Sequence, residues 1–347
     1  MGPSSRYRVF SYLPYYKAAG IEYRVSPLFG DWYLKAIWNH KSKLLVLHKI
    51  IWAYIRRIKD ALMVDSNSIV YIGAELLPFF PPVMEFLLYK RGVKYIIEFD
   101  DAVFCTYDYA NSMLIRKILS GKFPYAIRKA SVVICGCQYL ADYASQWNRN
   151  VVIIPTSIDA NKYFVKREEG AVPVVGWIGS SSTSPNIRIV AEAIRHVQKK
   201  CKFEFVLVGY DRKYEYLLNG CLYKILDWKS DEEVRMLNSF TIGIMPLADT
   251  PFSRGKCAFK LVQYMSVGIP TISTPLQSNV DIDKGCGNLF AKSTDEWEKA
   301  LLTLLLDQNL CREIGERNKA ISNKYYTFQV NALKYINIIN NLKSGNG

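Results

Sequence analysis

Two successive series of short β-branched runs, each run followed by a segment of helix length, constrain the fold of this chain more than any other feature. Runs such as Val-Val-Ile-Cys and Val-Val-Ile-Ile are apolar without alternation, which is typical of strands that helices cover on both faces. Strands that alternate with helices form parallel sheets joined by crossover connections. The sequence therefore predicts an α/β fold with two parallel sheets.

The first series predicts strands at 8–13, 68–73, 93–99, 131–136 and 151–155. The second series predicts strands at 172–179, 203–209, 224–228, 241–247, 269–274 and 287–291. Three helices are expected after them, at 295–307, 310–324 and 328–342. In the last helix Leu333, Ile336 and Ile339 recur at helical spacing and mark the face that we expect to be covered.

The length of 347 residues exceeds what one hydrophobic core usually serves, so we expect two domains. A charged stretch with Gly and Pro, 162–173, separates the two series of strands and has the composition of an interdomain linker. We expect a first domain at 1–165, with a C-terminal helix at 326–347 packing back on it. The second domain is expected at 170–325.

The formal net charge of +14 indicates an anionic partner, which a nucleotide, a nucleic acid or a phospholipid would satisfy. Most of the basic excess lies in 1–165. The sequence has neither a run of five like charges nor a repeat of aromatic and basic residues. We therefore expect no nucleic acid partner.

The segment 32–59 contains seven Lys or Arg and no acidic residue. Its apolar residues follow a helical period: Leu44, Leu47, Ile51, Ile55 and Ile58. No apolar run approaches the ~20 residues that cross a bilayer, but a basic amphipathic helix can lie on anionic lipid. An ordinary helix that packs on the first sheet with a basic outer face explains the pattern equally well, so both interpretations stay open.

Eight cysteines in a chain of this length do not indicate a disulfide scaffold, and no secretory signal opens the sequence. We expect a cytoplasmic protein, peripheral on the inner face of the plasma membrane if 32–59 binds lipid. Cys135 and Cys137 lack a second pair of ligands at metal-binding spacing, so we expect buried thiols and no metal site.

Ligands of open α/β sheets bind beyond the carboxyl ends of the strands, and two such sheets facing each other leave an interdomain cleft there. Gly176-Trp-Ile-Gly-Ser-Ser-Ser-Thr183 follows a predicted strand, and Pro185 suits the first turn of a helix through Ile194. Small residues let the backbone approach an anion, and hydroxyls and amides bind phosphate oxygens. Helix capping by Ser and Thr would explain the same loop.

The segment 246–270 also follows a predicted strand and places Arg254, Lys256 and Lys260 at the start of a helix. Cations there oppose the helix dipole unless an anion compensates, and a diphosphate would do so. Lys256 and Lys260 are expected on one helical face, followed by Gln263, which suits a ribose hydroxyl. A solvated loop with extended Lys side chains is the alternative.

This segment resembles the donor-binding signature of glycosyltransferase family 4, a retaining family with two Rossmann-like domains in the GT-B architecture. The usual pattern is Glu-x7-Glu followed by Ala-Met-Ala-x-Gly-x-Pro. Residues Gln263-Tyr-Met-Ser-Val-Gly-Ile-Pro270 match the second half, with Gln263 and Gly255 in place of the two acids. The closer resemblance is to a bacterial branch with the pattern Arg-Gly-Lys-Cys-x-x-Lys-Leu-x-Gln-Tyr-Met, whose members make polysaccharides.

The resemblance implies a UDP- or GDP-sugar donor, a GT-B fold whose sheets face an interdomain cleft, and no metal or other cofactor. The residues that it implies for the donor site are Gly179, Ser180, Ser181, Asp249, Arg254, Lys256, Lys260 and Gln263. The crossing into the second domain at 154–159 and the final helix are also similar to the family. The base, the sugar, the acceptor, the linkage and the oligomeric state are not determined by the sequence.

The strand end Ile97-Glu-Phe-Asp-Asp-Ala102 resembles the acidic strand end of the same branch. We expect Asp101 to orient an acceptor hydroxyl, with helix capping or an ion pair as the alternative. Lys260 and Arg254 are expected to stabilise charge on the departing phosphate. Trp228 ends another strand and is expected either to border the nucleobase or to pack as an ordinary core or surface residue.

The predicted function is retaining transfer of a sugar to a glycan or to a lipid-linked saccharide acceptor, in the synthesis of a cell-surface polysaccharide. One rival is a GT-B epimerase of sugar nucleotides, which would act without an acceptor. The other is a non-enzymatic protein that binds anionic lipid or nucleic acid through its charge.

Overall fold

The computed structural model describes residues 3–30, 32–33, 36, 43–165 and 172–345 of the chain. The chain divides into two compact units, the first formed by Met1–Pro155 with Asn331–Gly347 and the second by Thr156–Val330. The division falls before the predicted linker at 162–173. Of that linker, 166–171 lies outside the described residues, while Tyr163 is buried in the core of the second unit.

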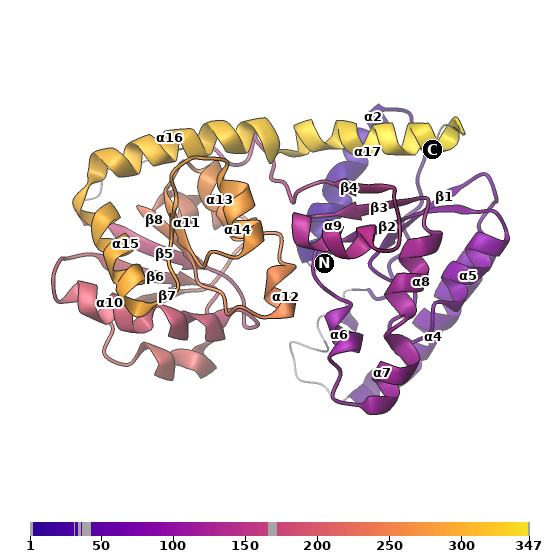
Figure 1. Cartoon of the computed structure of the whole chain (residues 1–347), viewed down its shortest axis with the longest axis horizontal. Helices are drawn as coiled ribbons and strands as arrows, with labels where there is room; N and C mark the ends of the chain where they lie inside the picture. Colours follow the sequence, from indigo (N-terminus) through magenta and orange to yellow (C-terminus); the bar gives the residue numbers. More distant parts are fainter. Residues whose placement is uncertain (1–2, 31, 34–35, 37–42, 166–171, 346–347) are drawn as a thin grey trace. The chain divides into compact units, whose positions relative to one another are not determined.

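The first unit contains a parallel sheet with the strands in sequential order, β1 (Ile69–Gly73), β2 (Lys94–Phe99), β3 (Val132–Cys135) and β4 (Val151–Ile153). Figure 1 shows α17 (Phe328–Lys343) on one side of this sheet, and α5 (Val83–Lys90) and α8 (Lys122–Lys129) on the other. The remaining named helices between the strands are α6 (Cys105–Asp108), α7 (Met113–Leu119) and α9 (Gln138–Ser145), and α4 (Lys43–Leu62) precedes β1. Four of the five strands predicted for the first series are thus confirmed.

The strand predicted at 8–13 is wrong, because this segment is helical. It contains α1 (Pro3–Arg8), the 3-10 helix η1 (Phe10–Tyr12) and α2 (Leu13–Ala18), which has proline in its first turn. Tyr12 and Tyr16 lie one helical turn apart, and their rings are 4.6 and 6.5 Å from the ring of Tyr335 in α17. The helical spacing of Tyr12 and Tyr16 therefore places both rings on one face, where they are buried against Tyr335.

Helix α17 joins the first unit through buried polar contacts. The Tyr335 hydroxyl donates to Glu98 at 2.6 Å, and Arg8 forms an ion pair with the same carboxylate. Lys94 Nζ donates to the carbonyl of Leu342 at 2.6 Å. The covered face of the helix contains Ala332, Tyr335 and Leu342, whereas Leu333, expected on that face, is exposed.

The second unit contains six parallel strands in the order β10-β9-β8-β5-β6-β7. Their bounds are β5 (Val174–Ile178), β6 (Glu204–Val208), β7 (Lys224–Leu226), β8 (Ile242–Met245), β9 (Thr271–Ser273) and β10 (Leu289–Phe290). All six predicted strands of the second series are confirmed. The helical elements are η2 (Ser184–Ile189), α10 (Ala191–Gln198), η3 (Arg212–Leu218), α11 (Glu233–Asn238), α12 (Pro251–Arg254), α13 (Phe259–Ser266), α14 (Gln277–Asp283), α15 (Thr294–Leu306) and α16 (Gln308–Tyr325).

Helices cover both faces of the second sheet, as the unbroken apolar runs predict. On β5, Val175 and Trp177 belong to the core formed with α10 and α15, while Ile178 belongs to the core formed with α11 and α13. A Cβ at Gly176 would lie 2.1 Å from the Phe240 ring, so glycine is required for this close packing. None of the helices in the described part of the chain is long and apolar enough to span a bilayer.

Candidate functional site

The strand order of the second sheet has a switch point between β5 and β8. From β5 the chain continues to β6 and β7 on one side, and it later returns to β8, β9 and β10 on the other. Ligands of open parallel sheets bind beyond the carboxyl ends of the strands at such a point. The two predicted segments follow these strands, with 179–183 after β5 and 246–258 after β8.

Tyr264 of α13 fills the gap where β5 and β8 separate. These strands pair only near their amino ends, at Val175 with Ile242 and at Gly176 with Gly243. Beyond that pairing, the Tyr264 hydroxyl accepts from Ile178 N at 3.0 Å and donates to the Ile244 carbonyl at 3.2 Å. The buried hydroxyl therefore replaces a ladder hydrogen bond at the base of the switch point.

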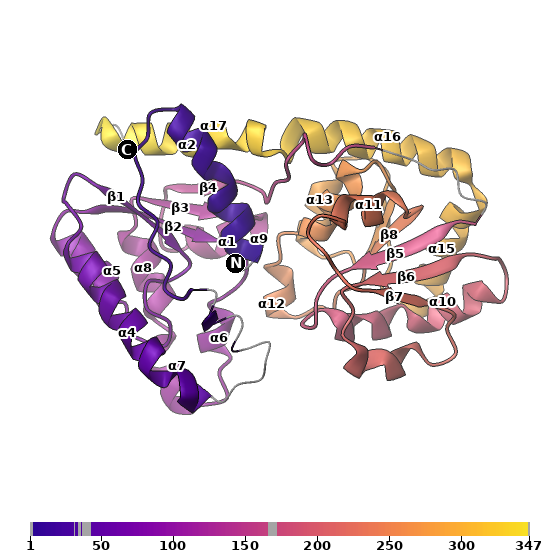
Figure 2. The same ribbon diagram turned by 180° about the vertical axis from the view of Figure 1, so that it is seen from behind.

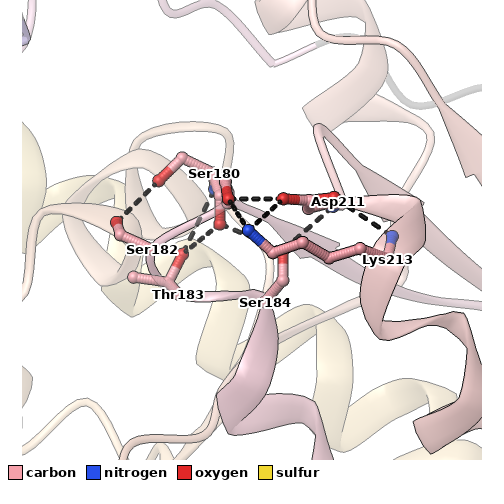
Figure 3. Close-up of polar contacts among 7 residues, drawn as sticks. Ser180, Ser182, Thr183, Ser184, Asp211 and Lys213 are labelled. Atoms are coloured by element: carbon pink, nitrogen blue, oxygen red, sulfur yellow. Dashed lines mark hydrogen bonds and ion pairs between the residues drawn. The ribbon is translucent and has the colours of Figure 1, made fainter. Parts of the chain in front are cut away.

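The loop after β5 folds on itself through its hydroxyl groups (Figure 3). Thr183 Oγ1 accepts from Ser180 N at 3.2 Å, and the hydroxyls of Ser180 and Ser182 lie 3.1 Å apart. Gly179 N donates to the Val208 carbonyl at 3.0 Å. The amides of Gly179 and Ser180, two residues of the predicted donor site, thus already donate hydrogen bonds to other groups of the chain. The helix expected next begins as the 3-10 helix η2 and becomes α-helical only at Ala191.

Ser181 faces the loop that follows β6. Its hydroxyl donates to Asp211, whose carboxylate also forms an ion pair with Lys213 at 3.0 Å (Figure 3). The hydrogen bond from Ser181, followed by those from Lys213, lowers the pKa of Asp211 to about 2. Gly209 has φ +71°, and a Cβ there would lie 2.5 Å from the Gly179 carbonyl. The loops after β5 and β6 are therefore locked together.

Lys260 of α13 lies beside the serine loop. Its Nζ donates to Thr183 Oγ1 at 3.2 Å and lies 4.6 Å from the centre of the Trp177 ring. Burial, together with the charge of Lys256, lowers the pKa of Lys260 to about 7. Across the described ranges of the chain, Lys260 takes part in no ion pair. A partly buried amine with these neighbours is stabilised by an anion placed next to it.

The other two predicted cations lie before α13. Arg254 ends α12 and makes two hydrogen bonds to Asp249, at 2.6 and 3.1 Å, so the two predicted site residues neutralise each other. Lys256 precedes the helix, with its Nζ 4.9 Å from the Phe252 ring centre. The shared helical face predicted for Lys256 and Lys260 is therefore wrong, although the charge of Lys256 is close enough to lower the pKa of Lys260.

Gln263 is only 4% exposed and points into the core of the second unit. Its amide donates to the Tyr163 hydroxyl at 3.0 Å, and that hydroxyl donates to Glu233 at 2.5 Å. Glu233 also accepts from Nε1 of Trp228 at 2.9 Å. The predicted ribose contact of Gln263 stays a prediction, and the structure instead connects this residue to the exposed Trp228.

Asp101 belongs to the first unit, so it is not among the residues that the second unit brings together. It lies two residues beyond the carboxyl end of β2, next to Asp100. Among the residues that the structure describes, no group of three or more His, Cys, Asp or Glu is arranged to hold a metal ion.

Residues 172–307 match the family model described as glycosyl transferases group 1, and this segment holds the whole of the loop cluster described above. Residues 172–307 thus form a glycosyl transferases group 1 domain. No curated protein sequence matches the chain significantly.

Solved structures confirm that the chain has the GT-B fold. A glycosyltransferase from Rickettsia africae ESF-5 is 13% identical with a TM-score of 0.70, and the match covers 100% of this chain and 97% of that one. HepE of Anabaena in complex with UDP is 14% identical with a TM-score of 0.65, covering 83% and 82%. Sucrose-phosphate synthase of Thermosynechococcus elongatus is 12% identical with a TM-score of 0.62, covering 80% and 74%.

The sequence reasoning missed several residues of the candidate site. Asp211 and Lys213 follow the strand-end Gly209, and this position after a strand was the signal that could have identified them. Asn186, whose side chain accepts from Ala248 N at 3.0 Å, joins the segment after β5 to the segment after β8. No local pattern distinguishes this asparagine, because its partner is 62 residues away.

Proposed function

We propose that the chain is a glycosyltransferase that binds the diphosphate of a nucleotide sugar at the β5/β8 switch point of the second unit. The observation that carries this proposal is Lys260, a partly buried amine of lowered pKa between a hydroxyl and an aromatic face, with Lys256 nearby. A diphosphate would supply the missing negative charge. Ser181 and Ser182 would add hydroxyl groups beside it.

The donor that we propose is a UDP-sugar. HepE of Anabaena has been solved with UDP, with UDP and glucose, and with UDP-glucose, and its match covers 83% of this chain. Trp228 lies beside the carboxyl ends of β5 and β6, because a Cβ at Gly209 would be 3.3 Å from the Trp228 Cβ and 2.5 Å from the Gly179 carbonyl. An exposed indole held by Glu233 at this edge suits the face of a nucleobase.

The reaction that we propose is retaining transfer of the sugar to a glycan or lipid-linked saccharide in cell-surface polysaccharide synthesis. Lys260 would stabilise the negative charge that develops as the C–O bond to the diphosphate breaks, and Arg254 would share this role by exchanging Asp249 for the diphosphate. The departing phosphate would accept the proton of the attacking hydroxyl. Asp101 of the first unit would orient that hydroxyl. The family resemblance and the positive charge of residues 1–165 support this choice of acceptor.

A nucleotide panel with a matched pair of lysine variants tests the donor site. We expect UDP-sugars to raise the unfolding temperature of the parent protein and of the control variant Lys224→Ala. Lys224 is the first residue of β7, so it lies at the amino ends of the strands, away from the candidate site at their carboxyl ends. Lys260→Ala should lose the shift. If UDP- and GDP-sugars stabilise neither the parent nor the control, or if they stabilise Lys260→Ala equally, the donor site is misplaced. Turnover of UDP-sugar without any acceptor would instead indicate an epimerase.

A further inference from the structure

Helix α4 exposes the apolar stripe that a helix of a globular protein normally buries. Ile51 and Ile55, one turn apart, are 51% and 47% exposed, and Leu47 continues the stripe a turn earlier. Trp52 is 68% exposed beside them. Figures 1 and 2 show α4 next to α5 in the first unit. The stripe thus leaves several large apolar side chains in water, which marks an interaction surface.

A different face of α4 already holds the helix to the first unit. Ala53 and Ala61 are buried, and Arg57 donates to the Ser26 carbonyl at 2.5 Å. Arg91, after α5, donates to the carbonyls of Leu62 and Val64 at the end of α4. The exposed stripe is therefore not required to fix the helix in place.

Two exposed phenylalanines adjoin this surface. The Tyr54 hydroxyl of α4 donates to the Pro78 carbonyl at 3.0 Å, and the Tyr54 and Phe80 rings are 5.4 Å apart. Phe79 and Phe80 are 60% and 52% exposed. Their segment follows β1, so the apolar surface reaches the carboxyl edge of the first sheet.

The surface is basic as well as apolar. A groove of about 480 Å³ is lined by Trp32, Trp52, Ala53, Ile55, Lys49, Arg56 and Lys59. The acidic residue of α4, Asp60, is already bound by Ser26 and Arg24. Phosphate groups of an anionic lipid complement such cations, while a tryptophan at the boundary suits the interface between head groups and acyl chains.

We propose that the α4 docking surface, meaning the exposed face of α4 with Phe79 and Phe80, binds the surface of an anionic phospholipid bilayer. The apolar stripe enters the boundary of the acyl chains, and Lys49, Arg56 and Lys59 meet the lipid phosphates. Nucleic acid fits less well, because it offers no partner for the aliphatic stripe. Given the proposed function, the position beside the end of β1 would bring a lipid-linked acceptor to the edge of the sheet where ligands bind.

Vesicle sedimentation of the full chain tests this surface. Vesicles of phosphatidylcholine with phosphatidylglycerol should bind the parent protein, and binding should weaken as salt rises or when phosphatidylglycerol is left out. The double variant Ile51→Ser with Ile55→Ser should weaken binding by roughly tenfold or more. Lys49→Gln with Lys59→Gln should weaken binding to anionic vesicles selectively.

The matched control is Leu114→Ser with Ile118→Ser in α7, which removes exposed apolar side chains from another helix of the same unit. This control should bind vesicles as the parent does. The proposal is overturned if the parent does not bind anionic vesicles, or if the α7 control loses as much vesicle binding as the α4 variant. It is also overturned if RNA displaces the parent from the vesicles when RNA and lipid are present at equal concentrations of negative charge. UDP-sugars should still raise the unfolding temperature of every one of these variants. The proposal for the lipid surface can therefore be contradicted independently of the proposal for the donor site.

Discussion

At the scale of single residues, Lys260 is the side chain whose surroundings most restrict what it can do. Its amine lies between Thr183 and the ring of Trp177, and its pKa is lowered to about 7. Arg254 has a similar charge, but Asp249 already neutralises it. Their spacing in the sequence predicted a common role for the two cations. In the structure their surroundings differ, because Arg254 has an acidic partner and Lys260 lies beside a hydroxyl and an aromatic ring.

Donor affinity should therefore depend on the protonation of Lys260. Below about pH 7 the amine is already charged in the free protein, so the donor binds without a proton change. A bound diphosphate raises the pKa of this amine, so the amine stays charged in the complex at higher pH. Above that pH, binding must take up a proton, and affinity should fall by up to about tenfold per pH unit. Titration calorimetry from pH 6 to 9 with an intact UDP-sugar, whose diphosphate stays ionised, measures this decline and the proton uptake.

Lys260→Arg provides the control, because a guanidinium stays protonated throughout this range. Its donor affinity should change little with pH, even if it is weaker overall. Equal pH dependence in the parent and in Lys260→Arg would show that another group takes up the proton.

At the scale of elements, the sequence predicted ten of the strands and the two loops of the site because buried parallel strands leave a strong local signal. The strand predicted at 8–13 failed since Tyr12 and Tyr16 pack on Tyr335, a contact that no local pattern reveals. The face predicted for α17 was wrong in part, because Leu333 is exposed while Ile336 and Ile339 are half-buried, and the buried Tyr335 was not counted. The shared helical face of Lys256 and Lys260 failed because α13 begins only at Phe259.

Tyr264 shows how a motif residue acts on the elements around it. Tyr264→Phe removes one hydroxyl and leaves Ile178 N and the Ile244 carbonyl without their buried partner. We expect the free energy of unfolding to fall by about 2–4 kcal/mol, equivalent to roughly 5–10 °C in a unit of this size. Calorimetry measures the shift, and weaker UDP-sugar binding should accompany it. A change below about 0.5 kcal/mol would mean that the strands close without the hydroxyl.

At the scale of the whole molecule, two compact units share one chain, and only the second carries the candidate donor site. A chain of this kind unfolds in more than one step when the units differ in stability. A ligand that binds one folded unit stabilises that unit by mass action.

Scanning calorimetry should accordingly show two transitions, of which a UDP-sugar raises one. At a concentration of about 100 times Kd the gain is about 2.7 kcal/mol, or roughly 5–10 °C. Tyr335→Phe removes the hydrogen bond to Glu98 in the first unit, so it should lower the other transition and leave the ligand-sensitive one unchanged. A single unfolding transition, shifted both by the UDP-sugar and by Tyr335→Phe, would contradict the division into two units that unfold separately.

The first unit is assembled from both ends of the polypeptide, since Glu98 of β2 binds Arg8 near the beginning and Tyr335 near the end. The continuous stretch that makes the second unit, Thr156–Val330, lies between these two partners in the sequence. During translation, the Glu98 carboxylate therefore cannot gain its hydrogen bond from Tyr335 until the whole of the second unit has been synthesised.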